Sequence, residues 1–514
     1  MVHQILRNRL GLLTIPLIFG TGVWQIREFK LNTVAHAHTS LIAVDTSTPQ
    51  VYPALPTLMP EITVNTSTQH KSSISSDVIR EMDAYLQAHH DIGWFAGSAI
   101  ISRGGDLLFA GGYGMSNVEH RVANTPQTRF RIGSISKQFT AAAILQLQDR
   151  GLINVEASVS TYLPDYPNGE SITLHHLLTH TSGIPNMTSF PDYTEWMRLV
   201  TTLDDIVARF RELPLEFAPG ESYAYSNSGY VLLSQVIEAV SGQTYADYLE
   251  EQVLKPLGLE HTGYERRLAV INGLAEGYQL TESGYQSAEY INMDVPQGAG
   301  GLYSTVEDLA QWNQILFGQR MPQTILSEEA IELMTTPHVS MGIEDMPHLF
   351  YGYGFVVNDR PDRPHIGHDG GINGFVSSLA YLPKEEVTIA VLSNVQDANP
   401  GQLSKDLVAI LLGKPYELPS LPDSITLDPA LYERYVGTYQ LTPDFQISVT
   451  VENDQLKIQG TGRSPVTLYP ISETEYFSRI INNLRIIFNL ATDGTVESIS
   501  LMEGEVETVA TKID

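Results

Sequence analysis

Strand-like segments lie at both ends of a long region whose middle is helical, and this order restricts the fold more than any other feature of the sequence. The stretch GSAIISRGGDLLFAGGYG, at 97–114, predicts a β-hairpin with RGGD as its turn. Near the other end, GFVSSLAYLPKEEVTIAVLSN, at 374–394, contains two strand-like runs around a charged turn. Helical patterns lie between the two, so we predict an α+β domain over 76–413. Its antiparallel sheet is assembled from distant segments and flanked by helices.

Three helices in this region have recognisable ends. Ser76 precedes DVIREMDAYLQAHH, an amphipathic run that it can cap. A second helix is predicted to begin just after Asn227 and to end at Gly242, since glycine is common at a helix C-terminus. Ser304 and Glu307 have the spacing of a capping box before another helix.

Beyond a proline-rich linker at 414–429, the chain is almost entirely strand-like. Phe445, Ile447 and Val449 alternate with polar residues, which is the pattern of a strand with one buried face. The stretches ENDQ and ATDGT that follow are hairpin turn signals. We therefore predict a small antiparallel β-domain over 430–514, either a barrel or a sandwich.

The first residues have the order of an export signal. Arg7 and Arg9 precede an apolar run, 10–24, that is short for a full membrane span. We expect a signal or membrane anchor at 1–37, where an AHA triplet offers a cleavage site, and a Ser/Thr/Pro-rich linker at 38–75. This predicts an exported protein, periplasmic or extracellular, with cleavage and anchoring both open. A buried N-terminal helix is the alternative.

The composition excludes several kinds of function. The 514 residues carry a formal net charge of −29, which repels phosphate backbones, so we expect no nucleic-acid partner. The chain contains no cysteine, which excludes disulfides, thiolate metal sites, a cysteine nucleophile and a lipoprotein anchor. It does not decide the compartment, because a chain of this size folds without disulfides in either redox environment.

The stretch RFRIGSISKQFTAAAILQLQDRG, at 129–151, predicts an amphipathic helix with an unusual start. Ser134 and Lys137 are three residues apart and therefore share a helix face. A serine hydroxyl needs an adjacent base to act as a nucleophile, and a lysine is that base only if its pKa is lowered. The positive end of the helix contributes to that lowering, and the Ser134 N–H can donate to an oxyanion.

The stretch GSISKQFTAAAILQL resembles the nucleophile helix of the serine β-lactamase and penicillin-binding-protein superfamily, above all its class C branch. That branch also contains DD-peptidases, D-aminopeptidases and esterases. Tyr225 and Asn227, in YAYSNSGY, resemble the family's Y-x-N element. His368, Asp369 and Gly370, in GHDGGINGF, resemble its K-T-G or H-x-G strand. LLTHTSGIP and GGLYSTVEDLAQW resemble two structural signatures of the branch.

The resemblance implies a fold for each of the two predicted domains. It implies a β-lactamase/DD-peptidase-like domain over about 80–400, in which an all-helical subregion accompanies the antiparallel sheet. Residues 430–514 resemble the lipocalin-like β-barrel that is appended to some members of the branch, so the barrel is the form that the resemblance favours for this tail.

The resemblance also implies a catalytic role for three residues. Ser134 would attack a carbonyl carbon and form an acyl-enzyme. Lys137 and Tyr225 would share its proton, first as base and then returning it to the leaving group.

Four further positions are implied in substrate binding. Asn227 would hydrogen-bond a substrate amide or hold the lysine in place. His368 would bind a substrate carboxylate or tune the tyrosine. Gly370 and Gly371 allow close backbone approach, and the Gly371 N–H would be the second oxyanion donor.

Three alternatives concern individual residues. His365 starts a second H-x-G match, but the glycines after His368 fit the family better. His176 and His180 have the i, i+4 spacing of a helical zinc pair but lack a metalloprotease glutamate, so we predict no metal and no cofactor. Ser136 is interpreted as a helix-start residue, although its hydroxyl lies near enough to be a rival nucleophile.

Together these features predict an exported serine hydrolase that acts on β-lactam, D-amino-acid peptide or ester substrates. A small molecule or a peptide, such as a peptidoglycan fragment, would be its partner. Two alternatives are a non-catalytic binder of cell-wall peptides and a carrier with an inert N-terminal domain. The sequence predicts neither the oligomeric state nor the residue that orients a deacylating water.

Overall fold

The computed structural model describes residues 74–513 except 319–324, 344–345, 443–444, 462, 482–483 and 504–505. The predicted export signal at 1–37 and almost all of the linker at 38–75 lie outside the described residues. Within the described part of the chain, no helix is long and apolar enough to cross a lipid bilayer.

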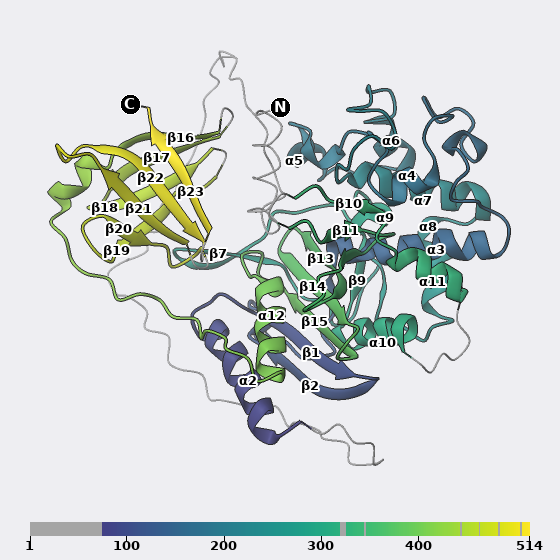
Figure 1. Ribbon diagram of the computed structural model, residues 1–514, viewed down its shortest axis with the longest axis horizontal. Helices are drawn as coiled ribbons and strands as arrows, with labels where there is room; N and C mark the ends of the chain where they lie inside the picture. The colour runs from purple at the N-terminus through teal and green to yellow at the C-terminus, as the bar shows by residue number, and fades with distance from the viewer. Residues whose placement is uncertain are drawn as a thin grey trace, which may run out of the picture.

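An eight-stranded antiparallel sheet forms the centre of the first domain, in the order β10-β11-β12-β13-β14-β15-β1-β2 (Figure 1). Its strands are β1 Gly97–Arg103, β2 Asp106–Tyr113, β10 Val339–Ser340, β11 Leu349–Tyr351, β12 Val356–Asn358, β13 His365–Ile372, β14 Phe375–Leu382 and β15 Val387–Ser393. The β1–β2 hairpin and the β14–β15 pair confirm the two predicted strand regions. Because β1 pairs with β15, with Gly97 opposite Ser393, the sheet joins distant segments as predicted.

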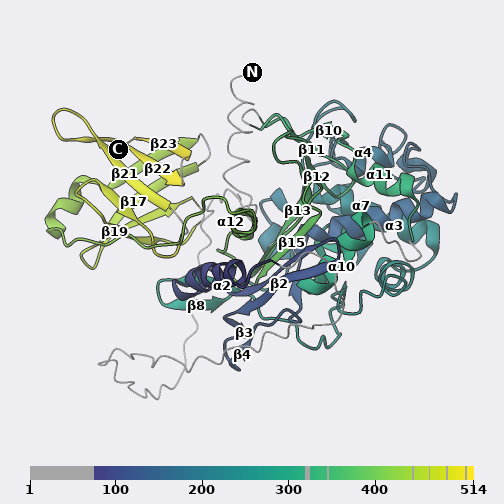
Figure 2. The ribbon, with the colours of Figure 1, turned by 60° about the horizontal axis from the view of Figure 1, so that its bottom comes forward.

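Helices cover both faces of this sheet, which confirms the α+β class. They are α2 Ser76–Asp91, α3 Ser136–Asp149, α4 Leu174–Leu178, α5 Tyr193–Trp196, α6 Leu203–Ala208, α7 Asn227–Ser241, α8 Tyr245–Tyr248, α9 Gln297–Gly300, α10 Val306–Phe317, α11 Glu328–Thr335 and α12 Pro400–Leu411. Figure 2 shows α2 and α12 on one side of the sheet and α3, α7 and α10 on the other. Each side has its own apolar core, and the central strands β1, β14 and β15 contribute buried residues to both.

Short elements connect the main layers. They are η1 Gly133–Ile135, η2 Val159–Thr161, η3 Met187–Ser189, η4 Leu249–Leu254 and η5 Pro429–Arg434, with small sheets formed by β3 Met115–Asn117, β4 Val122–Ala123, β5 Phe130–Arg131, β6 Gly263–Tyr264, β7 Tyr278–Thr281, β8 Gly284–Ser287 and β9 Leu302–Ser304.

Two predicted helix caps are wrong by one residue. Ser75, not Ser76, caps α2 by accepting the Val78 N–H. The cap of α10 is Thr305, whose hydroxyl accepts the Asp308 N–H, and not Ser304. The reason at α10 is that β9 keeps the chain extended through Ser304, so the helix starts later than local spacing suggests.

The predicted end of the second helix is confirmed. Gly242 ends α7 in the left-handed region, with φ 71°. The same helix begins at Asn227 itself, one residue earlier than predicted.

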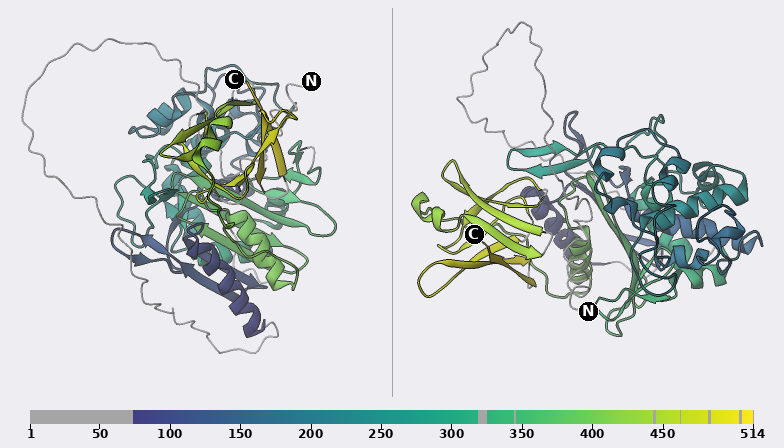
Figure 3. Two further views of the ribbon diagram at one scale, coloured as in Figure 1. Left: turned by 90° about the vertical axis from the view of Figure 1, so that its left-hand side faces the viewer. Right: turned by 90° about the horizontal axis from the view of Figure 1, so that it is seen from above.

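The C-terminal residues form a closed eight-stranded barrel, which Figure 3 shows at one end of the molecule. Its strands are β16 Gly437–Thr442, β17 Phe445–Glu452, β18 Gln455–Gly460, β19 Val466–Pro470, β20 Glu475–Phe477, β21 Leu484–Leu490, β22 Val496–Glu503 and β23 Val506–Lys512. Ile447 and Val449 point into a core that includes Tyr435, Tyr439 and Phe488, which confirms the predicted alternation. Its resemblance to lipocalins stays a prediction.

The barrel contacts the first domain through a few polar groups. Glu282, in the turn between β7 and β8, accepts hydrogen bonds from the Thr467 N–H and the Tyr469 hydroxyl, each at 3.1 Å. The Trp94 indole N–H donates to the Arg479 carbonyl at 3.0 Å.

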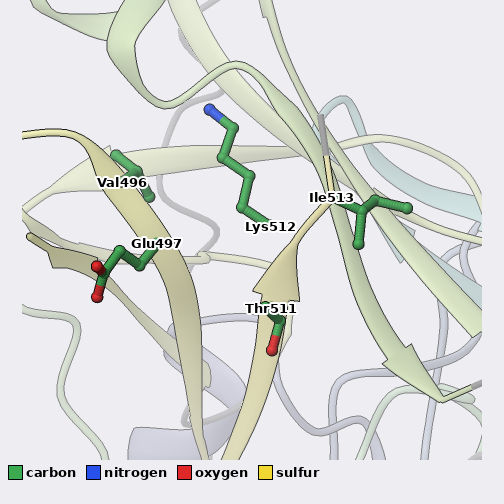
Figure 4. A pocket seen from close by; sticks show the side chains of 5 residues that line it. All are labelled: Val496, Glu497, Thr511, Lys512 and Ile513. Atoms are coloured by element: carbon green, nitrogen blue, oxygen red, sulfur yellow. The ribbon is translucent and has the colours of Figure 1, made fainter.

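Figure 4 shows a shallow hollow on the barrel itself, lined by Val496, Glu497, Thr511, Lys512 and Ile513.

The chain passes very close to the backbone of α3 just after β11. Gly354 has φ +76°, and a Cβ atom on it would lie 2.7 Å from the Lys137 carbonyl oxygen. Gly151 has a similar φ of +73° but would meet nothing within 4 Å. Substitution of these two glycines therefore distinguishes the cost of a positive φ, which both share, from the cost of a steric clash, which only Gly354 has.

We predict that Gly151→Ala costs about 1–2 kcal/mol of stability, from the left-handed conformation alone. Gly354→Ala should cost about 1–3 kcal/mol more, because the added methyl group must displace the backbone of α3. Thermal unfolding of both variants beside the wild type measures the difference. Equal melting temperatures for the two variants would contradict the close approach.

Candidate active site

Ser134 lies in the one-turn helix η1, directly before α3, and its side chain is half-buried. The predicted helix is therefore preceded by a tighter turn. Ser136, the rival hydroxyl, is fully buried and accepts the Leu302 N–H at 3.1 Å. Its oxygen is used inside the fold, so Ser134 is the hydroxyl that remains accessible to a substrate.

The Lys137 amine is fully buried within three oxygen atoms. Its Nζ atom lies 3.0 Å from Ser134 Oγ, 2.8 Å from Asn227 Oδ1 and 2.7 Å from the Ala299 carbonyl oxygen. Burial lowers the pKa of Lys137 well below its usual value, since the charged form loses its hydration. No carboxylate hydrogen-bonds to Nζ among the described residues.

When the Lys137 amine is neutral, these partners orient it. Asn227 Oδ1 and the Ala299 carbonyl can only accept hydrogen bonds, so they take the two N–H groups of a neutral amine. The remaining lone pair then faces the Ser134 hydroxyl. This arrangement is that of a base ready to accept the serine proton.

Tyr225 contacts the same serine from the other side. Its hydroxyl donates to Ser134 Oγ at 2.8 Å. Burial raises the pKa of Tyr225 above its usual value, which keeps the phenol protonated at neutral pH. Its ring also lies 4.8 Å from Lys137 Nζ. With the amine neutral, the tyrosine is therefore the donor to the serine oxygen and the lysine is the acceptor of the serine proton.

Asn227 is fixed by its own contacts. While its Oδ1 accepts from Lys137, its Nδ2 donates to Thr188 Oγ1 at 3.1 Å and its backbone N–H donates to Asn186 Oδ1 at 3.0 Å. Of the two roles that the sequence leaves open, this geometry favours holding the lysine in place.

His368 lies buried on β13, and both of its ring nitrogens have partners. Its Nδ1–H donates to the Asp369 carbonyl, and its Nε2 accepts from the Tyr351 hydroxyl at 3.0 Å. Burial is the main cause that lowers the pKa of His368, to about 3, because the charged ring would lose its hydration. A ring that is neutral at physiological pH is a weak partner for a carboxylate, so the geometry favours tuning of the Tyr225 ring, 6.2 Å away. His365 lies three residues away on the opposite face of β13.

The glycines of β13 lie against the segment that leads into Ser134. A Cβ atom on Gly370 would lie 2.0 Å from the Ile132 carbonyl oxygen, and one on Gly133 would lie 2.6 Å from the Gly371 nitrogen. Only a strand without side chains at these points can approach so closely. The Gly371 amide is therefore next to η1, and its oxyanion role stays a prediction.

The structure thus brings five predicted side chains together, from three separate segments of the chain: η1 with α3, the start of α7 with the residues before it, and β13. Figure 2 shows β13 beside the layer that contains α3 and α7. Sequence reasoning did not assign the Ala299 carbonyl, Thr188 or Tyr351. A backbone carbonyl has no residue signature, and the other two become neighbours only through tertiary folding.

His180 is a further residue whose position was not predicted. The helical spacing with His176 does not apply, because α4 ends at Leu178 and His180 has φ +60°. The Nδ1 atom of His176 accepts the Thr173 N–H, whereas the Nδ1 atom of His180 accepts the Ser226 N–H. Among the described residues, no cluster of three or more histidine and acidic side chains has the geometry of a metal site.

Comparison with known proteins identifies the families that this chain resembles. Residues 82–414 match the Beta-lactamase family, and residues 421–512 match a domain of unknown function, DUF3471. The chain is 30% identical over 445 residues to penicillin-binding protein 4* of Bacillus subtilis, which covers 81% of this chain and 95% of that protein.

Two solved structures are also similar. The octameric penicillin-binding protein homologue from Pyrococcus abyssi has a TM-score of 0.58 at 27% identity, covering 84% of this chain and 99% of that chain. A D-stereospecific amidohydrolase from Streptomyces sp. has a TM-score of 0.56 at 26% identity, covering 66% of this chain and 99% of that chain.

The site predicts an abnormal titration for one lysine. With ¹³C-labelled lysine, the NMR signal of Lys137 should titrate well below the ordinary pKa near 10.4, because burial disfavours its charge. Lys137→Ala identifies that signal by removing it. A spectrum in which every lysine signal titrates near the ordinary value would contradict the neutral amine.

Proposed function

The chain belongs to the β-lactamase and penicillin-binding-protein superfamily, and we propose that it is a serine hydrolase that works through an acyl-enzyme formed on Ser134. The superfamily has hydrolytic members, including the D-stereospecific amidohydrolase. One observation carries the proposal: the Ser134 oxygen lies between the Lys137 amine, at 3.0 Å, and the Tyr225 hydroxyl, at 2.8 Å.

Acylation follows from this geometry. Ser134 Oγ attacks the substrate carbonyl carbon while its proton passes to the Lys137 lone pair. The Ser134 and Gly371 N–H groups would stabilise the oxyanion of the tetrahedral intermediate. When the intermediate collapses, the bond to the leaving group breaks. The leaving group takes a proton from Tyr225, which is restored from the lysine. Water then releases the acyl group from the serine.

We propose β-lactam, D-amino-acid peptide or ester bonds as the substrate class, in the manner of the class C branch. The names of the relatives support acyl transfer on such bonds, since one is a penicillin-binding protein and another a D-stereospecific amidohydrolase. The neutral His368 favours substrates that are recognised without a cationic group at that position.

Location and partners are part of the proposal. The basic and apolar start of the sequence supports export to the periplasm or the exterior, with a signal or membrane anchor at 1–37. There the enzyme would meet small-molecule or peptide substrates, such as peptidoglycan fragments. The net charge of −29 argues against a nucleic-acid partner.

The alternative function is a penicillin-fold protein that binds cell-wall peptides without turnover. The alignment of Lys137, Tyr225 and Asn227 around the serine argues against it. A binder does not need a serine hydroxyl placed between a neutral amine and a phenol.

Intact-protein mass spectrometry after brief incubation with benzylpenicillin tests the nucleophile. We expect a covalent adduct or penicillin hydrolysis with the wild type, and a loss of at least about 10³-fold in Ser134→Ala. Ser136→Ala is the matched control and should retain the activity. If the wild type gives neither adduct nor hydrolysis, ester and D-amino-acid amide substrates are tested in the same way; failure of all three classes would favour the binder.

The pH dependence of acylation tests the base. The rate should fall as the pH decreases through the lowered pKa of Lys137, because only the neutral amine accepts the serine proton. Lys137→Arg keeps a long cationic side chain that stays protonated, so it should lose acylation at every pH. A normal rate in Lys137→Arg would remove lysine as the base.

A further inference from the structure

We propose that His180 is a positioning residue that holds the Tyr225 hydroxyl on Ser134 by binding the main chain on both sides of the tyrosine. The inference rests on the proposed function, because it concerns the efficiency of the same acylation step. It adds a residue that contacts neither the substrate nor the serine.

His180 accepts two hydrogen bonds, one from the residue before Tyr225 and one from the residue after it. The His180 carbonyl accepts the Ala224 N–H at 2.9 Å, and its imidazole Nδ1 accepts the Ser226 N–H at 3.1 Å. The residues before and after the tyrosine are therefore attached to one histidine. This fixes the position from which the Tyr225 side chain leaves the backbone.

The imidazole also packs against the tyrosine rings around the lysine. Its centroid lies 4.3 Å from the Tyr225 ring, 4.5 Å from Tyr351 and 5.2 Å from Tyr230. The Lys137 amine lies 4.8 Å from the Tyr225 ring. The histidine thus supports the face of Tyr225 in addition to its backbone.

The backbone of His180 is itself unusual. Its φ of +60° lies in the left-handed region, which non-glycine residues rarely adopt and which histidine and asparagine tolerate better than most. This conformation allows the carbonyl and the imidazole of one residue to reach the two N–H groups on either side of Tyr225.

A histidine is not needed at position 180 merely to fill space. Since Nδ1 accepts the Ser226 N–H, the ring proton of the neutral form is on Nε2, which has no hydrogen-bond partner in the described part of the chain. A buried N–H without a partner is unfavourable, because it has lost its hydrogen bond to water. A phenylalanine ring would occupy the same space without that cost, so the Nδ1 acceptor is the feature that the site requires.

Substitutions can separate the acceptor from the ring. His180→Asn keeps an acceptor close to the place of Nδ1 and tolerates a positive φ, but removes the ring. His180→Phe keeps a ring and removes the acceptor. His180→Ala removes both. The rate constant for acylation by benzylpenicillin, or by p-nitrophenyl acetate where penicillin is not a substrate, is measured for each.

We expect His180→Phe and His180→Ala to acylate about 10–100-fold more slowly, because a small displacement of a reacting group costs this much. His180→Asn should recover most of the loss, and the affinity for the reagent should change little. Equal rates for His180→Phe and the wild type would overturn the proposal. Slowing of all three variants in proportion to their loss of thermal stability would do the same.

A double-mutant cycle with Tyr225→Phe adds a readout that general destabilisation does not produce. If His180 acts through the Tyr225 hydroxyl, His180→Phe should have little further effect once that hydroxyl is absent. If the double variant were slower by the product of the two single-variant factors, the two residues would act independently, and this would contradict a positioning role.

The crystal structure of His180→Phe separates this inference from the proposed function. Displacement of the Tyr225 hydroxyl from Ser134 Oγ would support positioning even if the wild type were not acylated by any reagent, a result that would refute the hydrolase alone. An unmoved tyrosine, with normal acylation, would refute the role of His180 and leave the hydrolase intact.

Discussion

The burial of one lysine amine among groups that can only accept hydrogen bonds is the interaction on which the site depends. Lys137 is enclosed by the Asn227 amide oxygen and the Ala299 carbonyl, and burial lowers its pKa well below the usual value. A charged amine in that position would need a counterion, whereas a neutral one keeps a lone pair for Ser134. Much of the surrounding fold serves this arrangement, since α3, α7 and α9 each supply one part of it.

A cluster of aromatic residues packs around the Tyr225 side chain. His180, Tyr225, Tyr230 and Tyr351 pack together, and Tyr351 also donates to His368 on β13. The helical layer and the sheet are thereby joined at the point where the serine lies. Strand β13 approaches Ile132, just before η1, so closely that only glycine fits at position 370. This contact therefore fixes the position of η1 relative to β13.

Much of the architecture was predictable because its signals are local. The β1–β2 hairpin, the β14–β15 pair and the end of α7 at Gly242 each depend on residues adjacent in sequence. The alternation from Phe445 onward likewise predicted a strand with one buried face, and that strand is β17 of the barrel. The helix caps were wrong by one residue, because neighbouring elements, such as β9 before Thr305, decide where the chain leaves its extended form.

By itself, the sequence determined the order of strands and helices and the spacing that places Ser134 and Lys137 on one face, because both follow from the periodicity of a short segment. The tertiary structure decided which groups lie around that pair. The Ala299 carbonyl belongs to the backbone, and His180 reaches Tyr225 across 45 positions of sequence after leaving its helix. Contacts of this kind depend on packing between segments, and a one-dimensional pattern does not encode the distances between them.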